Sequence, residues 1–240
     1  MSKYSSEENN WISFSDLMTG LMVIFMFIAI SYMLQVQKKQ SERDLIFEEF
    51  QKTKEELYEE LNTEFKDDFE EWEVLLDKDL SIKFTNPSVL FRSGKARVRS
   101  TFRSILDDFL PRYFDILLQE KYQDNIAEIR IEGHTDQIPT EGSKNPYLGN
   151  LELSQDRARA VMKYFVRSSY YKALEEEQSE WLLFKMTANG LSYGKTLDSD
   201  YQYAFETGEK IDKKKSRRVE FRIVTSSEQL IERVLDLMEE

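Results

Sequence analysis

Residues 129–136 read Ile-Arg-Ile-Glu-Gly-His-Thr-Asp, and residues 150–158 read Asn-Leu-Glu-Leu-Ser-Gln-Asp-Arg-Ala. The first stretch continues an alternation that begins at Ile126 and predicts a β-strand ending in a polar loop. The second leads into apolar residues at helical spacing, which predicts a helix over residues 153–166 with Ser154 as its N-cap. A strand followed by such a helix is typical of a domain in which helices pack on a sheet.

Short apolar runs and one longer helical pattern surround this pair. A helix is predicted over residues 98–118, with Pro111 kinking or dividing it. Further strands are predicted over four segments: residues 80–84, 88–91, 181–187 and 218–224. The sequence therefore predicts an α/β domain of mixed strands and helices over residues 80–225, followed by a last helix within 226–240.

An apolar stretch lies near the N-terminus. No charged residue occurs between Asp16 and Lys38, and this length is enough to span the hydrocarbon core of a bilayer. We predict a transmembrane helix over residues 16–37 after a short cytoplasmic tail, residues 1–15. Two alternatives are a cleavable signal peptide, which lacks a basic start and a small-residue cleavage site here, and a buried helix of a soluble domain.

A charged segment over residues 38–79 separates the apolar stretch from the domain. Its apolar residues recur three, four or seven positions apart, which predicts an amphipathic helical spacer with a narrow stripe. Such a stripe suits a dimeric coiled coil or a helix that packs on the following domain. A solvated spacer with no partner is the alternative.

Composition excludes several classes of function. The net charge of −12 argues against a nucleic-acid partner, because phosphate binding needs clustered basic residues. The absence of cysteine excludes disulfides, zinc thiolates and iron-sulfur clusters. The single histidine, His134, has no second histidine or cysteine with metal-ligand spacing, so we expect neither an enzyme nor a metal site.

Four ordered blocks resemble the OmpA-like peptidoglycan-binding family. They are residues 129–136, 150–158, 188–194 (Ala-Asn-Gly-Leu-Ser-Tyr-Gly) and 216–221 (Ser-Arg-Arg-Val-Glu-Phe). The resemblance implies an α+β domain with a mixed sheet and helices on one face. It also implies that Asp136 and Arg157 bind the ammonium and carboxylate of diaminopimelate, while Asn150 and Leu153 shape the pocket. The alternative is a purely structural salt bridge between Asp136 and Arg157.

The opening of the apolar stretch carries a second resemblance. Residues 11–22, Trp-Ile-Ser-Phe-Ser-Asp-Leu-Met-Thr-Gly-Leu-Met, resemble the flagellar stator B subunit (MotB) and, within that superfamily, most of all the B subunits (ZorB) of the Zorya anti-phage defence system. The resemblance implies that Asp16 binds a translocated ion, with Ser15 and Thr19 as further oxygen ligands. A proton is expected, with sodium as the alternative. If instead Asp16 only precedes the helix, it is an N-cap.

The two resemblances together imply a peptidoglycan-anchored B subunit of an ion-driven motor in anti-phage defence. Expected partners are peptidoglycan, a second copy of the chain, and a ring of multi-helix A-type subunits in the bacterial inner membrane; no cofactor is expected. The C-terminal domain would be periplasmic, although Lys38, Lys39 and Arg43 after the apolar stretch favour the opposite orientation. A flagellar stator and a passive cell-wall tether are the alternatives; a hydrolase lacks a catalytic carboxylate pair.

Overall fold

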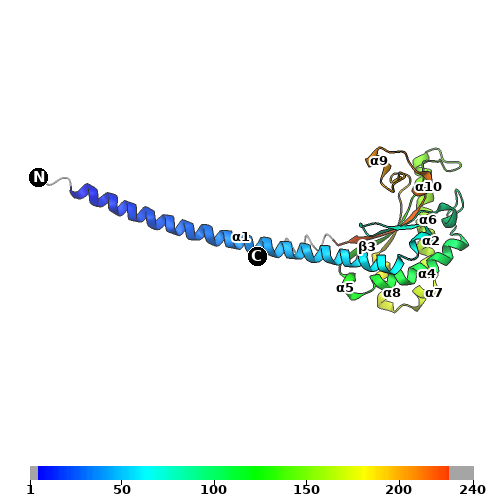
Figure 1. Cartoon of the computed structure of the whole chain (residues 1–240), viewed down its shortest axis with the longest axis horizontal. Coiled ribbons are helices and arrows are strands. Elements are labelled where there is room, and N and C mark those ends of the chain that lie inside the picture. Colours follow the sequence, from blue (N-terminus) through cyan, green and yellow to red (C-terminus); the bar gives the residue numbers. More distant parts are fainter. Residues whose placement is uncertain (1–4, 227–240) are drawn as a thin grey trace. The chain divides into compact units, whose positions relative to one another are not determined.

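The computed structural model describes residues 5–226 (Figure 1). The elements in chain order are α1 (Ser5–Phe65), α2 (Phe69–Trp72), β1 (Val74–Leu76), β2 (Ser81–Phe84), α3 (Pro87–Leu90), α4 (Ser100–Leu117), α5 (Glu120–Gln123), β3 (Ile126–Gly133), α6 (Pro146–Arg167), α7 (Ser169–Ala173), α8 (Glu176–Lys185), β4 (Met186–Gly190), α9 (Ala204–Thr207), α10 (Lys213–Ser216) and β5 (Val219–Thr225). The C-terminal helix expected within 226–240 lies outside the described residues.

The chain divides into two compact units. Of the described residues, one unit includes residues 5–50 and the other includes residues 51–226. The second unit includes the last turns of α1, where Leu57, Leu61 and Phe65 are buried in the core. These residues are four apart, so they lie on one face of the helix. The packed unit therefore begins within the segment that the sequence assigned to the spacer.

One five-stranded sheet organises the second unit, counting the strands within residues 51–226. Its strand order is β1-β2-β5-β3-β4. The β3 and β4 strands are parallel, with Ile131 opposite Ala188, and the other neighbours are antiparallel. The mixed sheet and the α+β class predicted from the sequence are confirmed.

The apolar face of the sheet carries the core. On β2 and β5, Phe84 and Phe221 alternate with polar residues and meet Phe109 of α4 at ring-centroid distances of 5.1 and 5.0 Å. Helix α6 packs beside α4 through Phe165 and Phe114, whose ring centroids lie 4.3 Å apart. Edge-to-face and offset aromatic contacts of this kind add to the burial of apolar area. The apolar face thus fixes α6 on the sheet.

The opposite face of the sheet is polar. Lys83, Glu220 and Glu132 lie side by side across β2, β5 and β3, and all three are buried. The segment that contains α9 and α10 lies on this side, away from α4, α7 and α8 (Figure 1). A row of buried charges needs compensating partners. Lys83 pairs with Asp77, Glu220 pairs with Arg218, and Glu132 lies near Arg222.

Two strand predictions were wrong. Residues 88–91 were expected to be extended, but Asn86 accepts a hydrogen bond from the Ser88 amide and begins α3. Residues 181–187 were expected to form a strand, but α8 continues to Lys185 and β4 starts at Met186. In both cases a polar N-cap residue, Asn86 or Glu175, stabilises a helix that the apolar residues alone do not predict.

The expected start of the second helix was also wrong. Helix α6 begins at Pro146, where Asn145 accepts hydrogen bonds from the amides of residues 147 and 148. Ser154 is therefore inside the helix, and its hydroxyl instead accepts a hydrogen bond from the Ser192 amide at 3.0 Å. Pro111 lies within α4, which runs as one helix from Ser100 to Leu117.

Among the described residues, one stretch could cross a membrane by its length and composition. This stretch is Phe14–Leu45 of α1, with 32 residues, and its large apolar side chains are exposed. Asp16 lies inside α1, which begins at Ser5. The interpretation of Asp16 as an N-cap is therefore wrong, since the helix has already started before it.

Candidate ligand-binding cleft and ion-binding residue

A cleft of about 800 Å³ in the second unit contains all four residues predicted to bind peptidoglycan. Asp136, Asn150, Leu153 and Arg157 line it together. Asp136 follows the end of β3, and the other three come from successive turns of α6. Residues predicted from two separate motifs thus share one site.

Two glycines allow α6 to approach the ends of the strands. A Cβ on Gly133, the last residue of β3, would lie 2.1 Å from the Ser154 carbonyl oxygen. A Cβ on Gly190, the last residue of β4, would lie 2.4 Å from the Gln155 amide nitrogen. Both distances are far below van der Waals contact, so only glycine permits this packing. The close approach brings Arg157 towards the loop that carries Asp136.

Asp136 is 4% exposed and has one fixed oxygen and one incompletely bonded oxygen. Its Oδ1 accepts a hydrogen bond from the Ile138 amide at 3.0 Å, which fixes the turn after β3. Its Oδ2 lies 3.4 Å from Nη1 of Arg217 and accepts no hydrogen bond from the described residues. A buried carboxylate oxygen in this state can accept a hydrogen bond from a ligand.

Arg157 is held by contacts other than Asp136. Its Nε donates a hydrogen bond to the Lys95 carbonyl at 3.2 Å, and its guanidinium lies 5.1 Å from the centre of the Phe91 ring. Burial and the nearby Arg217 lower the pKa of Arg157 to about 10, against the opposing effect of Asp136. The side chain is therefore positively charged at neutral pH. In the described domain Asp136 pairs with Arg217, so the alternative of an Asp136–Arg157 salt bridge is wrong.

Asn150 and Leu153 form the α6 wall of the cleft. The Asn150 amide group donates to the Ile138 carbonyl at 2.9 Å and so ties α6 to the loop after Asp136. Leu153 is half-buried and contributes apolar surface. Both therefore have positions that suit the role of shaping the pocket.

The sequence reasoning missed four arginines of the cleft, namely Arg92, Arg99, Arg217 and Arg218. Arg217 belongs to the Ser-Arg-Arg-Val-Glu block, which was recognised in the sequence. Its pairing with Asp136 could not be predicted from that block. Arg92 and Arg99 also line the cleft. They come from the segment between α3 and α4, which carried no recognised motif.

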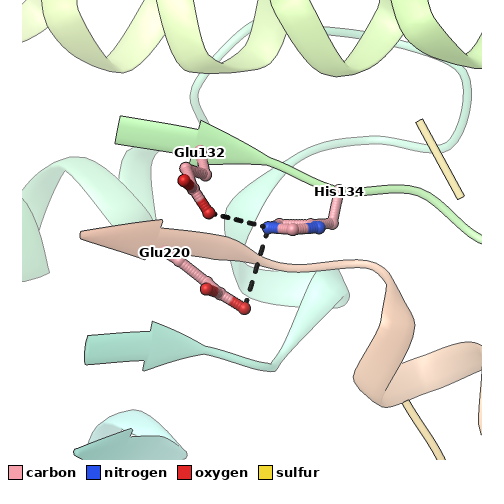
Figure 2. Close-up of side chains that lie close together, drawn as sticks. All are labelled: Glu132, His134 and Glu220. Carbon is pink, nitrogen blue, oxygen red and sulfur yellow. Dashed lines mark ion pairs between the residues drawn. The ribbon is translucent and has the colours of Figure 1, made fainter. Parts of the chain in front are cut away.

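Glu132, His134 and Glu220 form a buried charge cluster (Figure 2). Nε2 of His134 lies 3.7 Å from a carboxylate oxygen of Glu132 on β3 and 3.7 Å from one of Glu220 on β5. The Nε of Arg218 donates to Glu220 at 2.5 Å, and the Arg218 side chain also lines the cleft. The buried carboxylate of Glu220 therefore fixes Arg218, which is one of the arginines that line the cleft.

Charge balance explains why this cluster is stable in the interior. Burial alone would raise the pKa of Glu220, but the positive charges of His134, which is protonated in acid, and of Arg218 and Lys83 lower that pKa to about 2. Burial and the charge of Arg218 lower the pKa of His134, so its imidazole is neutral at pH 7. Arg222 lies 3.7 Å from Glu132 and 3.5 Å from Glu220. The two carboxylates thus offset two arginines.

Two carboxylates and an imidazole of this cluster are side chains of the kind that bind a divalent cation. Glu132, His134 and Glu220 each place one ligand atom within 4.8 Å of the others. However, Arg218 and Arg222 already compensate both carboxylates, and a dication would add uncompensated positive charge to a buried site. The cluster is better described as the structural support of Arg218.

The predicted ion-binding residues lie on α1. Asp16, Ser15 and Thr19 are all exposed, and the Thr19 hydroxyl donates to the Ser15 carbonyl at 2.8 Å within the helix. Among the described residues no ion pair or hydrogen bond of the Asp16 carboxylate is present. The helix thus presents a carboxylate but does not complete an ion site by itself.

Known proteins match the chain over nearly its full length. Residues 90–190 match the OmpA family. The Zorya protein ZorB of Escherichia coli (strain Crooks) is 37% identical over 237 residues, which is 97% of this chain and 95% of that protein. The chain belongs to the ZorB family. A second member of the ZorB family, from another Escherichia coli strain, is 28% identical over 91% of this chain and 81% of its own length.

Solved structures show weaker similarity. The cell wall anchor of the T6SS from Pseudomonas aeruginosa is 21% identical, with a TM-score of 0.45, over 69% of this chain and 97% of that one. The periplasmic domain of Helicobacter pylori MotB is 17% identical, with a TM-score of 0.41, over 65% of this chain and 81% of that one.

Proposed function

We propose that the cleft binds the diaminopimelate-bearing stem peptide of peptidoglycan. The observation that supports it is the grouping of Asp136, Arg157 and Arg217, which places a buried anion beside two cations. The free end of diaminopimelate carries an ammonium and a carboxylate. Asp136 suits the ammonium, and an arginine binds a carboxylate through two parallel hydrogen bonds.

We further propose that Asp16 binds the ion that drives a membrane motor. A carboxylate near the end of a membrane-spanning helix is costly to bury in its charged form unless it pairs or binds a cation. Protonation of Asp16 in such a site would switch one charge and shift a contact with a surrounding subunit between two states. A proton is the proposed ion, with sodium as the alternative because Ser15 and Thr19 offer oxygen atoms.

The complete assembly that we propose follows the family resemblance. Two copies of the chain would place their α1 helices within a ring of multi-helix A-type subunits in the bacterial inner membrane. The N-terminus would be cytoplasmic and the cleft periplasmic, where peptidoglycan is found. Membership of the ZorB family favours anti-phage defence over the flagellar alternative, and we expect the chain itself to be no enzyme.

A sacculus-binding experiment tests the role of the cleft. Asp136→Asn keeps an oxygen for the Ile138 amide but removes the charge, so retention of the purified full chain on isolated sacculi should fall about tenfold or more. Asp156→Asn is the matched control, because Asp156 lies on α6 and pairs only with Arg159. Equal retention of the wild-type chain and the Asp136 variant would contradict the proposal.

A further inference from the structure

Two arginines of the cleft have no part in the contacts described so far. Arg92 and Arg99 are exposed, and within residues 51–226 neither guanidinium forms an ion pair or a hydrogen bond. They belong to a cleft lined by five arginines, Arg92, Arg99, Arg157, Arg217 and Arg218, against the two acids Asp136 and Glu141. In a chain of net charge −12 this concentration of positive charge is local to the cleft.

The positions of Arg92 and Arg99 are fixed by a short loop. Phe91 and Val98 form an antiparallel bridge, and the Arg99 amide donates to the Leu90 carbonyl at 3.1 Å. The two arginines therefore flank the base of the loop formed by residues 92–97. Arg157 holds this loop on α6 through its hydrogen bond to the Lys95 carbonyl. The loop is thus one wall of the cleft, and its arginines lie on that wall.

The other three arginines of the cleft, Arg157, Arg217 and Arg218, already have contacts within the domain. Arg218 is neutralised by Glu220 at 2.5 Å. Asp136, Arg157 and Arg217 are sufficient for one ammonium and one carboxylate. A cleft of about 800 Å³ has room for more than the end of one amino acid. Arg92 and Arg99 are therefore available for a second anionic group of the same ligand.

We propose that Arg92 and Arg99 form a second anion subsite, which binds the α-carboxylate of the D-glutamate that precedes diaminopimelate in the stem peptide. This inference rests on the proposed function of the cleft. In a stem tetrapeptide the C-terminal carboxylate of D-alanine is the other free carboxylate on a residue next to diaminopimelate. The D-glutamate carboxylate differs from it in lying within the peptide, on the residue before diaminopimelate. Amidation removes its charge, so the chain prefers stem peptides in which this carboxylate is free.

The test compares two ligands that differ at one group. Calorimetry with the detergent-solubilised full chain uses a disaccharide-tetrapeptide whose D-glutamate α-carboxylate is either free or amidated. The wild-type chain should bind the free form roughly tenfold more tightly, the effect expected for a charge-assisted contact. The double variant Arg92→Gln, Arg99→Gln should lose this preference by binding the free form roughly tenfold more weakly.

Arg97→Gln is the matched control, because Arg97 lies in the same loop, is exposed, and does not line the cleft. It should keep the wild-type preference. Equal affinity of the wild-type chain for the two ligands, or an unchanged preference in the double variant, would overturn the second subsite while leaving the diaminopimelate site intact. If the wild-type chain binds neither ligand, both proposals fail.

Discussion

The cleft and the Asp16 region differ in how much of a site the chain supplies. In the cleft, β3, α6 and the loop before α4 bring charged groups from distant parts of the sequence together, and Asp136 already has a cationic neighbour. On α1, Asp16 is a single exposed carboxylate, with Thr19 bonded back to its own helix. Several packed elements form the cleft, whereas Asp16, Ser15 and Thr19 lie on a single helix.

This difference indicates where each function must be completed. A folded cleft can bind a small ligand on its own, so its variants should change affinity in the purified chain. Within residues 5–226 the Asp16 carboxylate has no ion-pair or hydrogen-bond partner, so we expect its proposed ion binding to require other subunits. The following predictions test that separation, beginning with the largest effect.

Asp16→Asn should abolish the protection of cells against phage when the chain is produced with its partner subunits. The amide cannot take up and release a proton, so no charge switches at that position. Plaque counts measure the effect, and retention on sacculi should remain at the wild-type level. Asp44→Asn is the control, since Asp44 lies on the same helix and pairs with its neighbour Arg43. Full protection by the Asp16 variant would leave only a passive tether.

Gly133→Ala should destabilise the second unit by about 1–3 kcal/mol, because the added Cβ would displace the α6 backbone at Ser154. Thermal unfolding of the full chain in detergent measures the change. Gly194→Ala provides the comparison, since its Cβ would meet its nearest atom at an ordinary 3.5 Å. An equal melting temperature for the two variants would contradict the close packing of α6 on β3.

Arg157→Ala should reduce retention on sacculi by about tenfold to a hundredfold, through loss of a charge-assisted contact of roughly 1.5–3 kcal/mol. It should also release the 92–97 loop, which loses its hydrogen bond from Arg157 to Lys95. Hydrogen exchange of that loop measures the second effect. Arg159→Ala, on the exposed side of α6, should change neither quantity. Wild-type retention of the Arg157 variant would remove this residue from the binding site.

We expect the free energy of unfolding of the second unit to fall gradually as the pH is lowered. The folded-state pKa of His134 lies below its usual 6.5, so the unfolded chain binds more protons and stability falls as the pH drops below 6.5. The slope from this one group is at most about 1.4 kcal/mol per pH unit. Glu220, with a pKa of about 2, adds a further loss below its usual 4.5.

His134→Gln should flatten the melting temperature between about pH 6.5 and 5, because the titrating imidazole is gone. The loss at lower pH should persist but become smaller, because the charge of protonated His134 is the largest of those that lower the pKa of Glu220. A variant that retains the full slope above pH 5 would show that the buried imidazole does not cause it.

The sequence predicted what alternation and motifs encode. Strand β3 and the sheet class follow from alternating residues and recognised blocks, and the same blocks contained Asp136 and Arg157. The helix α8 and the start of α6 were missed because Glu175 and Asn145 act as caps through local hydrogen bonds that outweigh the apolar pattern. A cap is visible in the sequence only when the helix boundary is already known.

The charge pairs of the cleft required the fold. Arg157 was expected beside Asp136. A buried arginine can contact any carbonyl, aromatic ring or carboxylate within reach. The position of the loop at Lys95 determines that Arg157 contacts a carbonyl and a ring. Likewise, Arg92 and Arg99 line the cleft in a loop that the bridge between Phe91 and Val98 closes. Spacing in the sequence contains neither fact.

Protease accessibility tests the central claim that one chain joins a membrane ion site to a peptidoglycan-binding domain outside the cytoplasm. Protease added to spheroplasts that produce the full chain should digest residues 51–227 while a cytoplasmic marker stays intact. Protection of this unit until the membrane is lysed would place the cleft in the cytoplasm, where there is no peptidoglycan, and would contradict the account.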